Sequence, residues 1–156
     1  MPRISENMKE RFKAVPAVYL FLKKDGNIFL TRRFNTGYKD GEYMVPSGHV
    51  EAGESLCAAM AREAMEEVGV LVRPVDLRLV HVMYRAAADA TGERADFFFD
   101  TASWEGEPRN CEPDKCDEVG WFPLYRLPQN TVGYLTDAIA ASSRGIPLLE
   151  LGWDTK

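Results

Sequence analysis

Residues 48–70 read GHVEAGESLCAAMAREAMEEVGV, and this stretch divides into a glycine-bearing loop and a helix. From Ser55 to Val68 the chain has neither glycine nor proline and is rich in Ala, Met and Glu, a composition that favours an α-helix. Ser55 is a suitable N-cap, and Gly69 is placed to end the helix. The stretch therefore predicts a loop over Ser47–Gly53, followed by one well-defined helix.

The predicted helix carries three carboxylates on one face. Glu63, Glu66 and Glu67 stand at i, i+3 and i+4, which places them within about 60–100° of one another around the helix axis. A hard cation would turn their mutual repulsion into coordination, because carboxylate oxygens are the ligands of Mg²⁺ and Mn²⁺. On the helix alone, a solvated acidic face is the alternative. The opposite side is expected to supply a core stripe: Leu56, Ala61, Ala64, Met65 and Val68.

The residues before and within the helix favour a functional site over a solvated acidic face. Gly48 allows the backbone to approach a ligand closely and to adopt a positive φ. Glu54 is placed to pair with Arg62, and that pair would hold the loop against the helix.

The stretch resembles the signature of the Nudix hydrolases: a Gly, five residues, a Glu, seven residues, then Arg-Glu-U-x-Glu-Glu-x-Gly-U, where U is apolar. All seven specified identities are present, with Ala64 and Val70 at the apolar positions. Seven identities arise by chance in about one in 10⁷ chains of this length, at about 6% frequency per residue. Pro46 before the stretch, and Trp121-Phe122 with Leu127-Pro128 after it, also look like the family.

The resemblance implies an enzyme that cleaves a nucleoside diphosphate linked to another moiety across its pyrophosphate, with Mg²⁺ or Mn²⁺ as cofactor. It implies an α/β/α sandwich around a mixed sheet, as a single domain over residues 1–156. Glu67, or an acid from a later loop, would orient or deprotonate the attacking water, and Arg62 and Glu54 would position their neighbours. The implied metal ligands are the Gly48 carbonyl, Glu63, Glu66 and Glu67, and the implied catalytic set is Arg62, Glu63, Glu66, Glu67 and Glu112.

The later loop, Asn110–Glu118, contains four acids, among which Glu112 and then Glu118 are favoured to complete the site; a solvated acidic loop is the alternative. Cations elsewhere are candidates for phosphate contact, although each alone is more often a surface residue. Aromatic residues are candidates for stacking a base, although aromatic residues in strands are more often core. The cations are Arg32, Arg33, Arg85 and Lys115, and the aromatic residues are Tyr43, Tyr38, Tyr84, Phe98 and Trp121.

The remaining elements predict an α+β fold, because strands both precede and follow the central helix. Val15–Leu22 and Ile28–Leu30 are expected to form a hairpin around Asp25-Gly26. The other predicted elements are strands at Tyr43–Val45, Leu77–Arg85, Ala95–Asp100 and Val119–Phe122, and a second helix at Thr131–Ser143.

Composition limits the partners. The chain has 156 residues and a net charge of -5 without a Lys/Arg cluster, which argues against nucleic-acid binding and against action on mRNA caps. The longest apolar stretch, Val15–Leu22, is too short to cross a membrane, and Met1–Asn7 shows no secretory pattern. Three cysteines suit reduced thiols, so a cytoplasmic location is expected. Arg144–Lys156 is apolar enough to dock on the core or on a second subunit, as in a homodimer.

The leading functional hypothesis is hydrolysis of a (deoxy)nucleoside triphosphate to monophosphate and pyrophosphate. An ADP-ribose or nucleotide-sugar pyrophosphatase is the alternative enzyme. No Ser-Gln-Pro-Trp string, which marks NADH enzymes of the family, follows the signature, and the proline typical of ADP-ribose enzymes is missing near Tyr84–Ala87. A non-catalytic nucleotide-binding regulatory domain is the alternative of another class, and such domains typically lose the helix glutamates that this chain retains.

Overall fold

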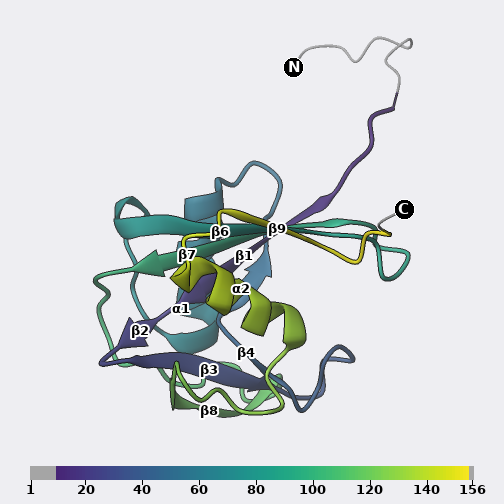
Figure 1. The fold of residues 1–156 in the computed structure, drawn as a ribbon. Helices are drawn as coiled ribbons and strands as arrows, with labels where there is room; N and C mark the ends of the chain where they lie inside the picture. The colour runs from purple at the N-terminus through teal and green to yellow at the C-terminus, as the bar shows by residue number, and fades with distance from the viewer. Residues whose placement is uncertain (1–9, 155–156) are drawn as a thin grey trace.

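The computed structural model describes residues 10–154, which form two sheets and two α-helices (Figure 1). The larger sheet has the order β5-β1-β7-β6-β9 and is mixed, since β1 pairs with β7 and β6 with β9 in parallel, and the other pairs are antiparallel. Its strands are β1 (Val15–Phe21), β5 (Ser47–His49), β6 (Leu77–Arg85), β7 (Arg94–Thr101) and β9 (Leu148–Leu151).

The smaller sheet is antiparallel and centres on β3, which pairs with its three other strands. Its strands are β2 (Lys23–Lys24), β3 (Asn27–Arg33), β4 (Tyr43–Met44) and β8 (Cys116–Pro123). The helices are α1 (Leu56–Val68) and α2 (Gly133–Ser143), and a short 3-10 turn, η1, covers Pro74–Asp76. The mixed sheet with two helices confirms the predicted α+β class.

The core lies on both faces of β1. Tyr19 and Phe21 join the apolar cluster that contains Leu135 of α2, whereas Val18 and Leu20 join the cluster built on α1. A strand buried on both faces is expected to read as a continuous apolar run, as Val15–Leu22 does. The two helices therefore cover opposite faces of the larger sheet.

That central position corrects the predicted hairpin. Asp25 and Gly26 do form its turn, with φ of 51° and 78° as a type I′ turn requires. However, only Lys23–Lys24 pair with β3 as β2, and Val15–Phe21 pairs with β5 and β7 in the other sheet. The apolar run gains burial on two faces there, which a two-stranded hairpin could not provide.

Helix α1 begins and ends as predicted. The Ser55 hydroxyl accepts a hydrogen bond from the Ala58 N–H at 3.1 Å, and Gly69 ends the helix in the left-handed conformation. The expected core stripe is wrong in part, because Ala61 is only half-buried and Met65 is 45% exposed. The fully buried positions border the acidic face rather than oppose it, since Glu63 and Glu67 themselves lie partly buried against β5. These buried positions are Ala59, Met60, Ala64 and Val68.

Other boundaries differ by a few residues. The predicted loop Ser47–Gly53 starts with the strand β5, which pairs with Ala17–Tyr19 of β1. Strand β8 begins at Cys116 rather than Val119, and α2 begins at Gly133 rather than Thr131. The glycine in β5 and the charged residues at the start of β8 make these segments read as loops. The strands that pair with them lie far away in the sequence.

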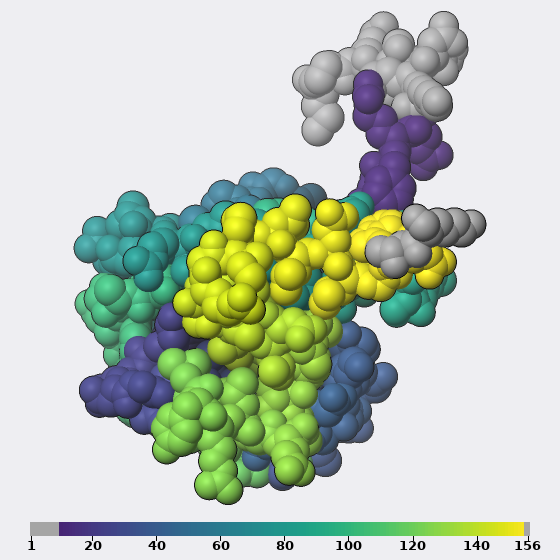
Figure 2. Space-filling view, viewed as in Figure 1, coloured from purple at the N-terminus to yellow at the C-terminus, as the bar shows by residue number. Residues whose placement is uncertain are grey.

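The C-terminal segment docks on the chain's own sheet. Leu148–Leu151 forms the edge strand β9 beside β6, and the Trp153 ring stacks on Tyr84. In Figure 2, β9 and α2 lie side by side on one face, and the segment 10–14 projects from the body. Met1–Asn7, Thr155 and Lys156 lie outside the described residues. Between residues 10 and 154, neither helix is long and apolar enough to span a bilayer.

Candidate active site

A cleft of about 640 Å³ collects most of the predicted site residues. Its walls come from both helices, from strands of both sheets, and from the loops that follow β3, follow β6 and precede β8. Of the predicted residues, those lining it are Gly48, Glu63, Glu66, Glu67, Glu112, Arg32, Arg33, Arg85 and Lys115.

Gly48 of β5 makes room for the first acid of the helix. A Cβ built at this position would overlap the Glu63 carboxylate, so any other residue would force that carboxylate to move. Its φ is not positive, which corrects the expectation that the residue serves a left-handed turn. The absent side chain lets the Glu63 carboxylate lie directly against the strand.

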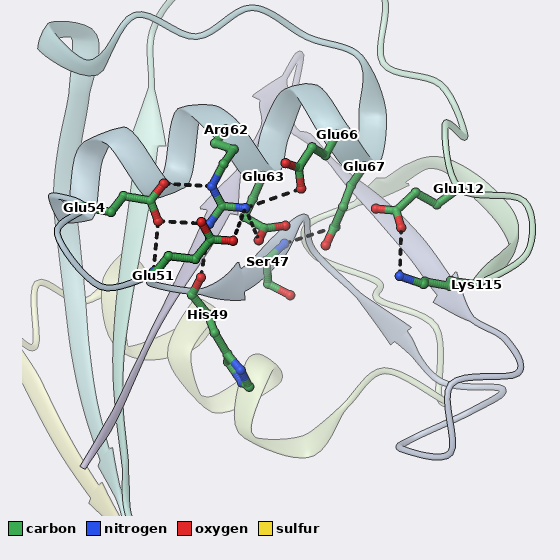
Figure 3. Close-up of polar contacts among 10 residues, drawn as sticks. All are labelled: Ser47, His49, Glu51, Glu54, Arg62, Glu63, Glu66, Glu67, Glu112 and Lys115. Atoms are coloured by element: carbon green, nitrogen blue, oxygen red, sulfur yellow. Dashed lines mark hydrogen bonds and ion pairs between the residues drawn. The ribbon is translucent and has the colours of Figure 1, made fainter. Parts of the chain in front are cut away.

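Arg62 ties the loop to the helix (Figure 3). Its Nε donates to Glu54 at 2.7 Å and its Nη2 donates to the same carboxylate at 2.9 Å. Its Nη1 donates to Glu63 at 2.9 Å and to Glu66 at 3.3 Å. These bonds from Arg62, with one from the Glu51 N–H, lower the pKa of Glu54 to about 2. One guanidinium thus fixes the loop and two of the three helix acids.

Glu67 lies deepest among the acids. One of its carboxylate oxygens accepts a hydrogen bond from the Ser47 N–H at 3.2 Å. Burial, followed by the charge of Glu63, raises the pKa of Glu67 well above its usual range. Burial also raises the pKa of Glu63, against the opposing effect of Arg62.

Glu112 points towards Glu67 from the loop before β8, beside Lys115 (Figure 3). Sequence reasoning missed the residue that shapes its loop. The Asn110 Oδ1 accepts from the Glu112 N–H at 3.0 Å, and its Nδ2 donates to the Cys116 carbonyl at 2.8 Å. The Cys111 N–H donates to the Glu67 carbonyl at 3.0 Å, so the loop is fastened to the end of α1.

The donor set fits a hard divalent cation. Glu63 and Glu67 both line the cleft, and burial raises both pKa values, with added repulsion from Glu66 at Glu63 and from Glu63 at Glu67. A bound cation would offset this cost. Within residues 10–154, no three Asp, Glu, His or Cys side chains already meet at one point. Joint coordination by Glu63, Glu66 and Glu67 therefore requires side-chain rotation, most easily by Glu66, whose side chain is 54% exposed.

The four predicted phosphate-contacting cations are already held by protein groups. Arg32 pairs with Asp117 at 2.7 Å and with Glu118 at 3.0 Å. Lys115 pairs with Glu112 at 3.5 Å. The remaining two, Arg33 and Arg85, donate to the Tyr38 carbonyl at 2.6 Å and to the buried Asp96 at 2.5 Å respectively. Among the acids of the loop before β8, Asp117 and Glu118 thus pair with Arg32, and only Glu112 lines the cleft.

The predicted aromatic contact, Tyr43, does not line the cleft. It is 6% exposed and packs edge-on against Phe122 with ring centroids 5.0 Å apart. Of the other aromatic candidates, Tyr38 alone lines the cleft. Lining residues that the sequence did not single out for the site are Ala17, Tyr19, Thr31, Thr36, Met44, Ser47, His49, Asp89, Arg94, Cys116 and Tyr134. No spacing in the sequence could have grouped them, because they come from separate elements.

Comparisons with known proteins identify the family of this chain. The family model for the NUDIX domain matches residues 11–139. The chain is 33% identical over 127 residues to the NAD-capped RNA hydrolase NudC of Escherichia coli O157:H7, a match that covers 80% of this chain and 46% of that protein. The chain therefore spans about half the length of this curated relative.

Solved structures show the same fold. A MutT NUDIX hydrolase from Burkholderia pseudomallei matches with a TM-score of 0.75 and 26% identity, covering 83% of this chain and 98% of that one. The MutT protein from Methanosarcina mazei Go1 matches in fold, with a TM-score of 0.71 and 20% identity, covering 87% of this chain and 97% of that one. The signature acids line the cleft, and the family model matches most of this chain. This chain therefore belongs to the Nudix hydrolase family.

Proposed function

We propose that this chain hydrolyses the pyrophosphate bond of a nucleoside diphosphate derivative, in a reaction that depends on Mg²⁺ or Mn²⁺. The observation that carries the proposal is the placement of Glu63, Glu66 and Glu67 on one wall of a cleft that Arg33 and Arg85 also line. An acidic chain can hold a polyanion when bound cations neutralise its phosphates and arginines contact the remaining charge.

The proposed chemistry is transfer of a phosphoryl or nucleotidyl group to water. Water attacks one phosphorus, the bond from that phosphorus to the bridging oxygen breaks, and the bridging oxygen leaves with the second phosphate. Glu67 and Glu112 are the carboxylates placed to accept the proton of the water, because both line the cleft and point towards each other. Bound Mg²⁺ or Mn²⁺ supplies positive charge for the pyrophosphate and lowers the pKa of coordinated water.

Arg62 and Glu54 serve the acids indirectly in this proposal. The guanidinium holds Glu63 and Glu66 at fixed positions, and Glu54 holds the guanidinium in turn. Both residues are positioning residues, since their groups are committed to one another rather than to the centre of the cleft.

The substrate we favour is a (deoxy)nucleoside triphosphate, cleaved to monophosphate and pyrophosphate, in line with the likeness to MutT structures. A pyrophosphate-linked dinucleotide such as NAD is the second candidate, because NudC is a relative at 33% identity. The sequence lacks the Ser-Gln-Pro-Trp string of NADH enzymes, which favours the first candidate. ADP-ribose and nucleotide sugars complete the set.

Product identification tests the proposal. The protein is incubated with nucleoside triphosphates, deoxynucleoside triphosphates, ADP-ribose, nucleotide sugars, NAD and a NAD-capped RNA, each with and without Mg²⁺. Metal-dependent release of monophosphate and pyrophosphate from triphosphates is expected. Cleavage of NAD or the capped RNA instead would replace the favoured substrate. Ligand-induced stabilisation without any product would support the non-catalytic binding domain and overturn the enzymatic proposal.

A further inference from the structure

The exposed loop over residues 34–42, between β3 and β4, has an unusual backbone. Asn35 and Lys39 have φ of 54° and 55°, and Gly37 and Gly41 have φ of 81° and 83°. A left-handed conformation is costly for residues other than glycine and persists only where surrounding contacts enforce it. Asn35 and Lys39, the two of these residues that are not glycine, therefore call for a local restraint.

Asp40 provides that restraint. Its carboxylate accepts from the Thr36 N–H at 3.0 Å, from the Gly37 N–H at 2.9 Å and from the Thr36 hydroxyl at 2.5 Å. Arg33 closes the loop from its other side, donating to the Tyr38 carbonyl at 2.6 Å and to the Thr36 hydroxyl at 3.1 Å. The loop is thus held by polar contacts rather than by burial.

The restraint fixes one aromatic side chain on the cleft. Tyr38 is 43% exposed and lines the cleft, and the Arg33 guanidinium stands 5.4 Å from the centre of its ring. Arg33, Glu63 and Glu67 line the same cleft, so the ring and the helix acids share one cavity.

Tyr38 belongs to a preorganised end of the cleft. The Arg85 guanidinium stands 3.9 Å from the ring centre of Tyr134, and its Nε is anchored by Asp96, which is fully buried. The Tyr19 hydroxyl donates to the same carboxylate at 2.9 Å. Planar π-faces and fixed cations suit a nucleobase, which stacks on aromatic rings whatever its identity.

We propose that the loop 34–42 is a nucleobase platform: the base of the substrate stacks on Tyr38, and Asp40 acts as a positioning residue that holds the ring in place. This proposal rests on the proposed function for the identity of the ligand as a nucleotide. It assigns the loop a role in binding, distinct from the chemistry at the helix acids.

Equilibrium binding tests the platform without turnover. In the Glu67→Gln protein with Mg²⁺, the affinity for each of the four nucleoside triphosphates is compared with that for inorganic tripolyphosphate, which has no base. Tyr38→Leu should weaken nucleoside triphosphate binding about tenfold to hundredfold and change tripolyphosphate binding by less than about twofold. Tyr38→Phe should retain binding. Tyr125→Leu is the matched control, because Tyr125 is 89% exposed and away from the cleft.

Asp40 is tested through its dependence on Tyr38. Asp40→Ala should reproduce the loss seen with Tyr38→Leu, and combining the two substitutions should cause no further loss, since Asp40 acts through the ring. Unchanged nucleoside triphosphate binding in Tyr38→Leu, or an equal loss for tripolyphosphate, would overturn the platform. Base-dependent binding through Tyr38, in a wild-type protein that hydrolyses nothing, would sustain it and overturn the proposed function instead.

Discussion

Gly48 is a glycine because the Glu63 carboxylate occupies the space that a Cβ would fill. The residue therefore matters to the site through what it lacks. The glycine is thus required by lack of space for a side chain and not by backbone conformation, because φ at Gly48 is one that any residue can adopt.

Gly48→Ala is expected to displace Glu63 and lower kcat/KM at least tenfold while the protein stays folded. Gly133→Ala is the matched control, because a Cβ there meets nothing within 4 Å and its φ is not positive. Steady-state kinetics and thermal melts of both variants check this. Wild-type kinetics in Gly48→Ala would show that the Glu63 carboxylate does not need its place against the strand.

The lowered pKa of Glu54 predicts that the free energy of unfolding depends on pH. Its pKa is lowered from 4.5 to about 2 in the folded protein, so its ionised form stabilises the fold above pH 4.5. That contribution is lost as the pH falls from 4.5 towards 2. The difference in Tm between wild type and Glu54→Gln should therefore be largest near pH 7 and shrink on acidification to pH 3.

Glu107→Gln is the control for this titration, because Glu107 is exposed and does not line the cleft. Its Tm should follow that of wild type throughout. A difference between wild type and Glu54→Gln that stays constant with pH would mean that the pair with Arg62 contributes little to folding.

At the scale of elements, the loop before β8 is held by hydrogen bonds within itself and to the end of α1. Asn110 closes a turn onto Glu112 and Cys116, and backbone bonds from Arg109 and Cys111 reach the last carbonyls of α1. The two elements that carry acids are therefore coupled through the main chain.

Asn110→Ala should lower kcat more than it raises KM, because it releases Glu112 from its position beside Glu67. In a Glu112→Gln background the same substitution should have little further effect on kcat, since its action passes through Glu112. A double-mutant cycle on kcat measures this. Additive losses would indicate that Asn110 acts on the fold at large, and a wild-type kcat in Glu112→Gln would remove Glu112 from the mechanism.

The sequence predicts helix α1 well because its signals are local: Ser55 caps the first turn and Gly69 ends the last. It fails where pairing is remote. Ser47–His49 contains a glycine and reads as a loop, yet it pairs with β1 about thirty residues earlier. In the same way, the position of Tyr43 in the core and of Tyr38 on the cleft depends on contacts with other elements.

At the scale of the whole molecule, the sandwich brings two helices, two sheets and three loops to one cleft. The signature predicts one wall of that cleft, since its acids lie within a single helix turn. The part of the lining that contains Tyr38, Tyr134 and the Asp96-anchored Arg85 is assembled by topology and has no signature of its own.

Removal of metal should destabilise the folded protein measurably. Binding to the native state alone stabilises it by about 2.7 kcal/mol when free metal is at 100 times Kd. Saturating Mg²⁺ should thus raise the Tm of the EDTA-treated protein by several degrees, and raise that of Glu67→Gln less. Equal shifts in both proteins would place any bound metal away from Glu67.

The central claim is that the acids of α1 perform hydrolysis in this cleft, and the most direct test is the kcat of Glu67→Gln in saturating Mg²⁺ on the best-cleaved substrate of the panel. Glu107→Gln serves as the carboxylate control. We predict a loss of at least a thousandfold for Glu67→Gln, an unchanged Tm in EDTA to within a few degrees, and wild-type turnover for Glu107→Gln. Turnover by Glu67→Gln within a few-fold of wild type would contradict the claim.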